Sequence, residues 1–191
     1  MAEPFEESPA AQATAVADQA NDPHKLTNAK VLAKLYELFG AETFTDVEEP
    51  YGLLTATTTP EQIHNVIQTL FNEQEMQFGF LTTMCGIHYP ENEGKELGMI
   101  YHLHSLVHNV RLRLKIFFSI LDPVVPTLTD VYATANWMER EAYDFYGIIF
   151  QGHPNLIRIL NVEDMDYYPM RREYPLEDGT REDKTDLFFG R

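Results

Sequence analysis

The spacing of hydrophobic residues along this chain is helical in two segments before residue 75, alternates in segments between residues 77 and 120, and is helical again before Gly147. The first helical segment follows Thr27, a suitable N-cap, and stops before Gly40, a suitable C-cap. One face of this segment carries its apolar residues: Val31, Leu32, Leu35, Tyr36 and Phe39. The pattern predicts a first helix between the two caps.

A second helix is predicted to begin at Pro60, because proline suits the first helical position and Thr59 can cap it. Gln62 lies three residues after Thr59 and completes a predicted capping box. The apolar stripe of this helix contains Ile63, Val66, Ile67, Leu70 and Phe71. Such a stripe predicts that the helix packs one face against another layer.

Four segments have the short apolar or alternating patterns that are typical of β-strands. They are residues 51–58, 77–89, 97–107 and 110–120. The last two are predicted to form a hairpin across His108-Asn109. In the last strand leucine and isoleucine alternate with arginine and lysine, so one face is predicted to be buried and the other wet. Together the elements predict a two-layer α+β domain, with helices on one face of a mostly antiparallel or mixed sheet.

A third helix is predicted from about Thr129 to Tyr146, because its apolar stripe is helical and Gly147 can end it. The chain after Gly147 shows no regular period and is predicted to form a long extended C-terminal tail that binds a partner. The first residues of the chain carry too little apolar surface to offset the entropy of ordering them, which predicts disorder. The predicted division is a disordered leader (1–24), an α+β domain (25–147) and a partner-binding tail (148–191).

Composition narrows the class of partner. The formal net charge is −16, which argues against nucleic acids and anionic membranes as main partners, because both would repel the chain. Cys85 is the only cysteine, which excludes a disulfide within the chain and a set of thiolates for an iron–sulfur cluster. No stretch approaches the roughly 20 apolar residues of a membrane span, and a signal peptide is not evident at the N-terminus. We therefore expect a soluble, intracellular protein.

His102 and His104 are alternate residues of a predicted strand and could share a metal ion. The predicted hairpin places His104 opposite Arg113 and His102 opposite Lys115. Fixed positive charges at these positions oppose cation binding, so a solvated or partner-facing sheet face is favoured. A remote alternative is a free-standing metal-dependent enzyme that uses His88, His102, His104 or His153.

Residues 136–153 concentrate the candidates for acid–base chemistry. Glu139, Glu141 and Asp144 could supply an acid and a base. Helical spacing instead predicts that Arg140 and Asp144 pair at i, i+4, while Glu139 and Glu141 lie on different sides of the helix. A charged helix face is therefore favoured over a catalytic site.

His153 lies between Gly152 and Pro154, a setting that is typical of a turn. Its imidazole is predicted to bond backbone groups of that turn rather than to transfer protons. The sequence contains none of the motifs GxSxG, GxGxxG or GxxxxGK[ST], which hold nucleophiles, dinucleotides or phosphates in other proteins.

Residues 137–147 read WMEREAYDFYG and are followed by GHPNL at 152–156 and RIL at 158–160. These segments resemble the signature of the 30 kDa subunit family of respiratory complex I, which in bacteria is the C-type subunit of NADH-quinone oxidoreductase. Residues 168–175, YPMRREYP, are similar to the second hallmark of that family, usually written PLRKDFP. The resemblance is strongest over residues 125–176.

Some positions depart from the family pattern. Ile157 stands where the family usually has a basic residue, and Met170 and Arg172 replace the commoner leucine and lysine. One basic contact of the family is therefore expected to be missing or moved in this chain.

The resemblance implies a non-catalytic structural subunit in the peripheral arm of a proton-translocating NADH:quinone oxidoreductase, on the cytoplasmic side of the membrane. The partners that it implies are the large quinone-site subunit of the 49 kDa type and the ferredoxin-like iron–sulfur subunits. It implies no cofactor in this chain, with FMN and iron–sulfur clusters in partner subunits and NADH and quinone as substrates of the complex. An alternative is the equivalent subunit of a related membrane-bound hydrogenase or of a complex with another electron donor.

The resemblance also changes the interpretation of the charged residues. Glu139, Arg140, Glu141 and Asp144 are expected to form hydrogen-bonded ion pairs that lock the third helix to the tail and to a partner. The three arginines of the tail are assigned to anchoring it on a neighbouring subunit. The predicted interface residues are Trp137, Glu139, Arg140, Glu141, Asp144, Gly147, Gly152, His153, Pro154, Arg158, Arg171, Arg172 and Pro175.

Overall fold

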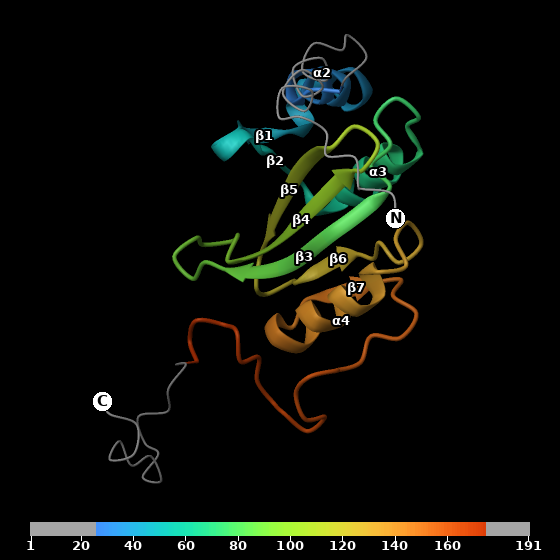
Figure 1. Cartoon of the computed structure of the whole chain (residues 1–191). Helices are drawn as coiled ribbons and strands as arrows, with labels where there is room; N and C mark the ends of the chain where they lie inside the picture. The colour runs from blue at the N-terminus through green and yellow to red at the C-terminus, as the bar shows by residue number, and fades with distance from the viewer. Residues whose placement is uncertain (1–25, 175–191) are drawn as a thin grey trace, which may run out of the picture.

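The structure is a computed structural model, and it describes residues 26–174 (Figure 1). The predicted leader, Pro175 and the rest of the predicted tail lie outside the described residues. The α-helices and strands of this part of the chain are α2 (Asn28–Phe39), β1 (Thr45–Glu48), β2 (Leu54–Thr58), α3 (Pro60–Asn72), β3 (Phe80–His88), β4 (Leu97–Ser105), β5 (Val110–Phe118), β6 (Val124–Pro126), α4 (Ala135–Tyr146) and β7 (Ile149–Gln151).

Five strands form one mixed sheet in the order β1-β2-β5-β4-β3. After β2 the chain crosses through α3 to the far edge of the sheet and returns by two hairpins, β3 to β4 and β4 to β5 (Figure 1). This path places β5 parallel to β2, and parallel neighbours require such a long crossover. The predicted two-layer α+β class with a mixed sheet is confirmed.

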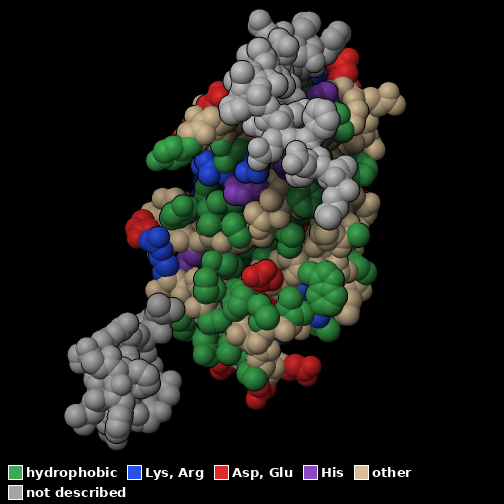
Figure 2. All heavy atoms as spheres, viewed as in Figure 1, with side chains coloured by type: hydrophobic (Ala, Val, Ile, Leu, Met, Phe, Trp, Pro, Cys, Tyr) green, Lys and Arg blue, Asp and Glu red, His purple; other side chains and the backbone are tan. Residues whose placement is uncertain are grey.

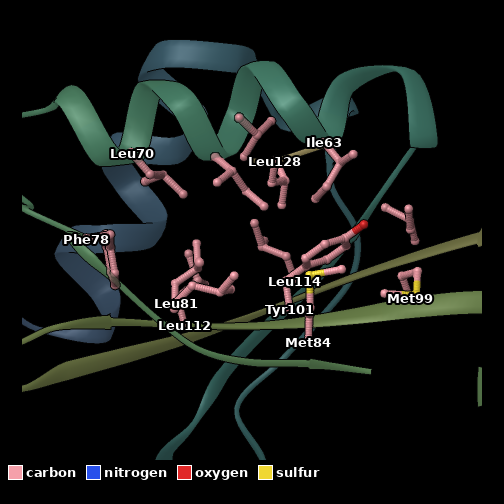
Figure 3. Packing of buried hydrophobic residues seen from close by; sticks show 14 of the residues in the cluster. Ile63, Leu70, Phe78, Leu81, Met84, Met99, Tyr101, Leu112, Leu114 and Leu128 are labelled. Atoms are coloured by element: carbon pink, nitrogen blue, oxygen red, sulfur yellow. The ribbon is translucent and has the colours of Figure 1, made fainter. Parts of the chain in front are cut away.

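The hydrophobic core lies between the sheet and α3. Leu112, Leu114 and Ile116 are fully buried, while the basic residues between them are partly or fully exposed. Figure 3 shows Ile63 and Leu70 of α3 pointing toward Tyr101, Leu112 and Leu114 of the sheet. The predicted alternation in β5 and the predicted stripe of α3 are thus confirmed.

Helix α4 packs on the same face of the sheet as the core, over β3. Gly86 of β3 pairs with Met99 of β4, whose side chain belongs to the core. A Cβ atom added at Gly86 would lie 2.5 Å from the ring of Tyr146 in α4, so the helix approaches the strand closely. Cys85 and Thr83 lie on the opposite face of the sheet, which α4 does not cover.

Two helix starts differ from their prediction in detail. α4 begins at Ala135 and not near Thr129, because the backbone N–H of Leu128 donates to the side chain of Glu139 and folds residues 127–129 back against the helix. α3 begins at Pro60 as predicted, but Thr59 makes no side-chain cap hydrogen bond, so the predicted capping box is wrong. In α2 the cap is confirmed, since Thr27 Oγ1 accepts from the N–H of Lys30.

Strand β7 was not expected from the sequence. Residues Ile149–Gln151 pair in parallel with Val124–Pro126 of β6, directly after the end of α4. Three residues are too few to display a period of two along the sequence. The pairing fixes the first part of the chain after Gly147 beside the segment that precedes α4.

Candidate functional site

Asp144 is the centre of the contacts between α4 and the chain that follows it. Its side chain is fully buried, and Oδ2 accepts the backbone N–H groups of Ile159, Leu160 and Asn161 at 3.1, 2.8 and 2.9 Å. Oδ1 accepts from Arg158 Nη1 at 2.8 Å and from the side-chain amide of Asn161 at 3.0 Å. Three successive N–H groups around one oxygen form an anion-binding nest.

This environment determines the charge of Asp144. Burial raises the pKa of its carboxyl, but the hydrogen bonds from Asn161, Leu160 and Ile159 outweigh it and hold the pKa below its ordinary value. Asp144 is therefore ionised at neutral pH, and both of its oxygens are occupied by donors. A carboxylate in this state is suited to holding a chain segment and unsuited to moving protons.

Arg158 is the cation that pairs with Asp144, so the predicted pair between Arg140 and Asp144 is wrong. Arg158 also donates through Nη2 to the backbone carbonyl of Met165 at 2.9 Å, and its guanidinium lies over the Tyr168 ring at 5.3 Å. A planar guanidinium can serve a carboxylate, a carbonyl and a ring at once. It thereby ties α4 to two separate turns of the tail.

Arg140 contacts the tail by another route. Its Nε donates to the carbonyl oxygen of Ile157 at 3.1 Å, and its guanidinium lies 4.8 Å from the ring centroid of Trp137. The expectation that the charged residues of α4 lock the helix to the start of the tail thus holds for Arg140 and Asp144, although these two side chains do not pair with each other.

Glu139 has a different role. Its side chain is fully buried on the side of α4 that faces away from Asp144. There Oε2 accepts from Thr127 Oγ1 and Oε1 accepts from the N–H of Leu128, each at 2.6 Å. Burial raises the pKa of Glu139 to about 7, although both hydrogen bonds act to lower it. No cation pairs with it among residues 26–174, so an ion pair of Glu139 with a partner stays a prediction.

Glu141 is exposed, which confirms that Glu139 and Glu141 lie on different sides of the helix. Within the part of the chain that the structure describes, Glu141 makes no ion pair either. Of the three carboxylates, one holds the tail, one holds the segment before the helix, and one faces solvent. They do not converge as an acid and base pair around one reacting atom.

Gly147 ends α4 in the left-handed conformation, with φ of +74°, as its position predicted. A Cβ atom there would lie 2.5 Å from the ring of Tyr168, so glycine also permits the tail to approach the helix end. His153 fixes the next turn as expected: its Nδ1 accepts from the N–H of Asn155 at 3.0 Å, and its Nε2 bonds the carbonyl of Asn136 at 3.1 Å. Gly152 and Pro154 flank this turn, with φ of +89° at Gly152.

Arg171 and Arg172 hold the last described turns on this same chain. Arg171 Nε donates to the carbonyl of Tyr146 at 2.8 Å. The backbone N–H of Arg172 donates to His88 Nδ1 at 3.0 Å, and its side chain lies 3.7 Å from Glu91. Anchoring of the tail on a neighbouring subunit by these arginines stays a prediction.

His102 and His104 of the sheet lie beside basic residues of the next strand. The hairpin register places His104 opposite Arg111 and His102 opposite Arg113, because four residues and not two connect the strands. The predicted partners, Arg113 and Lys115, were wrong by two residues. The observed partners lie on the same face of the sheet as the predicted ones and are also positively charged. Between Leu26 and Tyr174 no group of three potential metal ligands comes together.

An exposed apolar surface next to α4 could not be predicted from the sequence. Trp137, Leu160 and Val162 are each 62% exposed although they are large and hydrophobic. We call the following set the apolar tail surface: Trp137, Ile157, Leu160, Val162 and Met170. Figure 2 shows hydrophobic side chains spread over the lower part of the viewed face, where α4 and the tail lie in Figure 1. Large hydrophobic side chains that are exposed around one element are typical of sites of protein association.

Among residues 26–174, no helix is both long enough and hydrophobic enough to span a membrane.

Comparison with protein families gives one match over most of the chain. The family model for "Respiratory-chain NADH dehydrogenase, 30 Kd subunit" matches residues 56–180. The C-type subunit of the NADH-quinone oxidoreductase of Nocardioides sp. strain JS614 is 42% identical over 125 residues, which are 65% of this chain and 50% of that protein. The chain spans about half the length of such curated relatives.

Two solved structures are similar in fold. A trypsin-resistant fragment of Nqo5 is 29% identical, with a TM-score of 0.56 over 65% of this chain and 98% of that one. A chain of an archaeal respiratory membrane complex, the membrane-bound sulfane sulfur reductase, is 18% identical, with a TM-score of 0.65 over 78% of this chain and 85% of that one. The second likeness concerns the fold alone.

Proposed function

Because this chain belongs to the 30 kDa subunit family of the respiratory-chain NADH dehydrogenase, we propose that it is a non-catalytic subunit of a proton-translocating NADH:quinone oxidoreductase. In this proposal it lies in the peripheral arm, on the cytoplasmic side of the membrane. It holds the large quinone-site subunit together with the ferredoxin-like iron–sulfur subunits. FMN and the iron–sulfur clusters then belong to those partners, and NADH and quinone are substrates of the assembled complex.

The observation that carries the proposal is the pairing of a locked tail with an exposed apolar surface. Asp144, Arg158 and Arg140 fix residues 157–161 on α4 by hydrogen bonds. The same segment presents Leu160 and its apolar neighbours to the outside. A surface that is both fixed in shape and hydrophobic binds a partner with little loss of conformational entropy.

A charge placed on this surface tests the proposal. Leu160→Glu is expected to weaken binding of the partner subunits by at least about 2 kcal/mol, or about 30-fold, because an unpaired carboxylate would be buried at the interface. The measurement is affinity purification of the tagged full chain from its native membranes, with quantification of the flavin and iron–sulfur subunits. Leu121→Glu is the matched control, since Leu121 is 92% exposed but lies in the turn between β5 and β6. Equal recovery of partners with both variants would count against the proposal.

Arg140→Ala gives a second, smaller effect. It removes the hydrogen bond to the carbonyl of Ile157 and the contact with the Trp137 ring, so assembly is expected to weaken by about 1 kcal/mol, or about fivefold. Arg140→Lys should recover only part of this loss, because an ammonium group cannot reproduce the planar contact with the ring. Recovery of complex can be measured by native gel electrophoresis of solubilised membranes. Normal assembly accompanied by lost turnover would instead indicate a catalytic role.

The equivalent subunit of a related complex is the alternative that the fold leaves open, because the membrane-bound sulfane sulfur reductase contains a chain with a similar fold. Sequence identity favours the quinone oxidoreductase, at 42% to the Nocardioides subunit against 18% to the reductase chain. The subunits that co-purify with the tagged chain distinguish the two. A hydrogenase-type or sulfur-reducing subunit in place of the NADH-oxidising subunits would support the alternative.

A further inference from the structure

The face of the sheet opposite the core carries a group of basic side chains. Register places His104 beside Arg111 and His102 beside Arg113, and Lys115 follows on the same face of β5. We call these five residues the basic sheet face. Figure 2 shows Lys, Arg and His side chains gathered over the upper part of the viewed face, in a molecule whose formal charge is −16. The sign of this patch is therefore opposite to the net charge of the chain.

The cations of the basic sheet face lack acidic partners within the described chain. Arg113 Nε donates to the hydroxyl of Thr55 at 3.0 Å, and His104 Nε2 lies 3.3 Å from the amide oxygen of Asn109. Between residues 26 and 174 no carboxylate pairs with Arg111, Arg113 or Lys115. His102 Nε2 is buried without a hydrogen-bond partner. Unpaired cations in a row and an unpartnered polar atom indicate that a further, negatively charged group covers this face.

The N-terminal segment of this chain, residues 1–25, joins the fold at the edge of this face. Leu26 and Thr27 line the same surface pocket as Arg111. Residues 1–25 contain five carboxylates and one lysine. Arg111 and Lys115 are four positions apart on one strand, about 13 Å, whereas 25 residues can reach far more than that.

We propose that residues 1–25 bind the basic sheet face of the same chain through their carboxylates. Docking by a segment that is already attached raises its effective concentration, so weak individual ion pairs are sufficient. This inference is independent of the assembly role of α4 and the tail.

The other end of the chain is less suitable as the occupant. The described tail finishes beside His88 and Glu91, where the side chain and backbone of Arg172 make their contacts. His88 pairs with Leu97, whereas Arg111 pairs with His104, seven residues further along β4. The end of the described tail thus lies at the opposite end of the strands from Arg111. Geometry favours the N-terminal segment over residues 175–191.

Carbodiimide coupling of the intact full chain tests the proposal, because it joins a carboxylate to a lysine amine only where the two are in contact. At low ionic strength, peptide mass spectrometry of the monomer band should find Lys115 linked to one or more of Glu3, Glu6, Glu7, Asp18 and Asp22. Lys95, which is exposed in the turn between β3 and β4, should show no link to these residues. Arg111→Glu should lower the Lys115 yield about fivefold, as should 1 M salt, which shortens the Debye length to about 3 Å.

Several results would overturn the proposal. One is a Lys115 that stays unlinked to residues 1–25 while Lys30 or Lys34 couples to them. Others are links to residues 175–191, links found only between two copies in the dimer band, and a Lys115 yield that Arg111→Glu and salt leave unchanged. Lys95→Glu serves as the control variant for an added negative charge elsewhere on the surface.

Discussion

Replacing Asp144 with alanine is expected to lower the free energy of unfolding by about 3–5 kcal/mol. The substitution removes the acceptor of three successive N–H groups, at Ile159, Leu160 and Asn161. It also leaves the guanidinium of Arg158 without its carboxylate partner. Donors that were satisfied in a buried site then have no partner unless the segment opens to water.

Urea unfolding of the full chain measures the total loss of free energy of unfolding in Asp144→Ala. Amide hydrogen exchange shows which residues lose stability. The amides of residues 159–161 should lose protection in Asp144→Ala, while amides of β4 and β5 keep theirs relative to global opening. Asp166→Ala is the matched control, because Asp166 is an exposed aspartate of the same tail. Undiminished protection at residues 159–161 in Asp144→Ala would contradict the assignment of Asp144 as the tail lock.

The second large effect concerns Glu139 and depends on pH. Its pKa is about 7 in the folded chain, above the ordinary glutamate value of 4.5, so folding is accompanied by proton uptake between these values. The stability that this group contributes is complete below pH 4.5 and is lost as pH rises through 7. The difference of about 2.5 pKa units corresponds to about 3 kcal/mol.

Glu139→Gln should therefore flatten this part of the pH profile. The neutral amide can still accept from the N–H of Leu128 and bond the hydroxyl of Thr127, and it carries no charge to desolvate. The free energy of unfolding of the unaltered chain, relative to Glu139→Gln, is expected to fall by about 3 kcal/mol between pH 4.5 and pH 8.5. Glu141→Gln controls for the loss of a carboxylate from the exposed side of α4. Parallel pH profiles for the unaltered chain and Glu139→Gln would show that Glu139 is not buried in the way described.

The elements with a long regular period could be predicted from the sequence, and those whose shape depends on a distant contact could not. Helix α3 and strand β5 show their apolar stripes directly, because burial on one face repeats along the element. The start of α4 depends on Leu128 bonding a side chain eleven residues later, and no local pattern records that contact. Strand β7 is likewise defined by its partner β6 rather than by its own three residues.

In the candidate site, too, local features could be predicted from the sequence and distant contacts could not. Spacing along α4 identified the charged residues and separated Glu139 from Glu141, since sides of a helix follow from sequence. It assigned Asp144 to Arg140 because only local partners can be inferred from spacing, whereas the observed partners lie 14 to 17 residues away. The apolar tail surface was missed because its residues follow no period, and their exposure depends on how the tail turns.

The central claim is that α4 and the tail hold an assembly and do not carry out chemistry. The most direct measurement compares the amount of assembled complex in membranes with the NADH:quinone turnover per assembled complex, for the unaltered chain, Asp144→Ala and Asp166→Ala. The account predicts that Asp144→Ala lowers the amount of complex several-fold while the turnover of each complex that does assemble is unchanged. A normal amount of complex with lost turnover would contradict it.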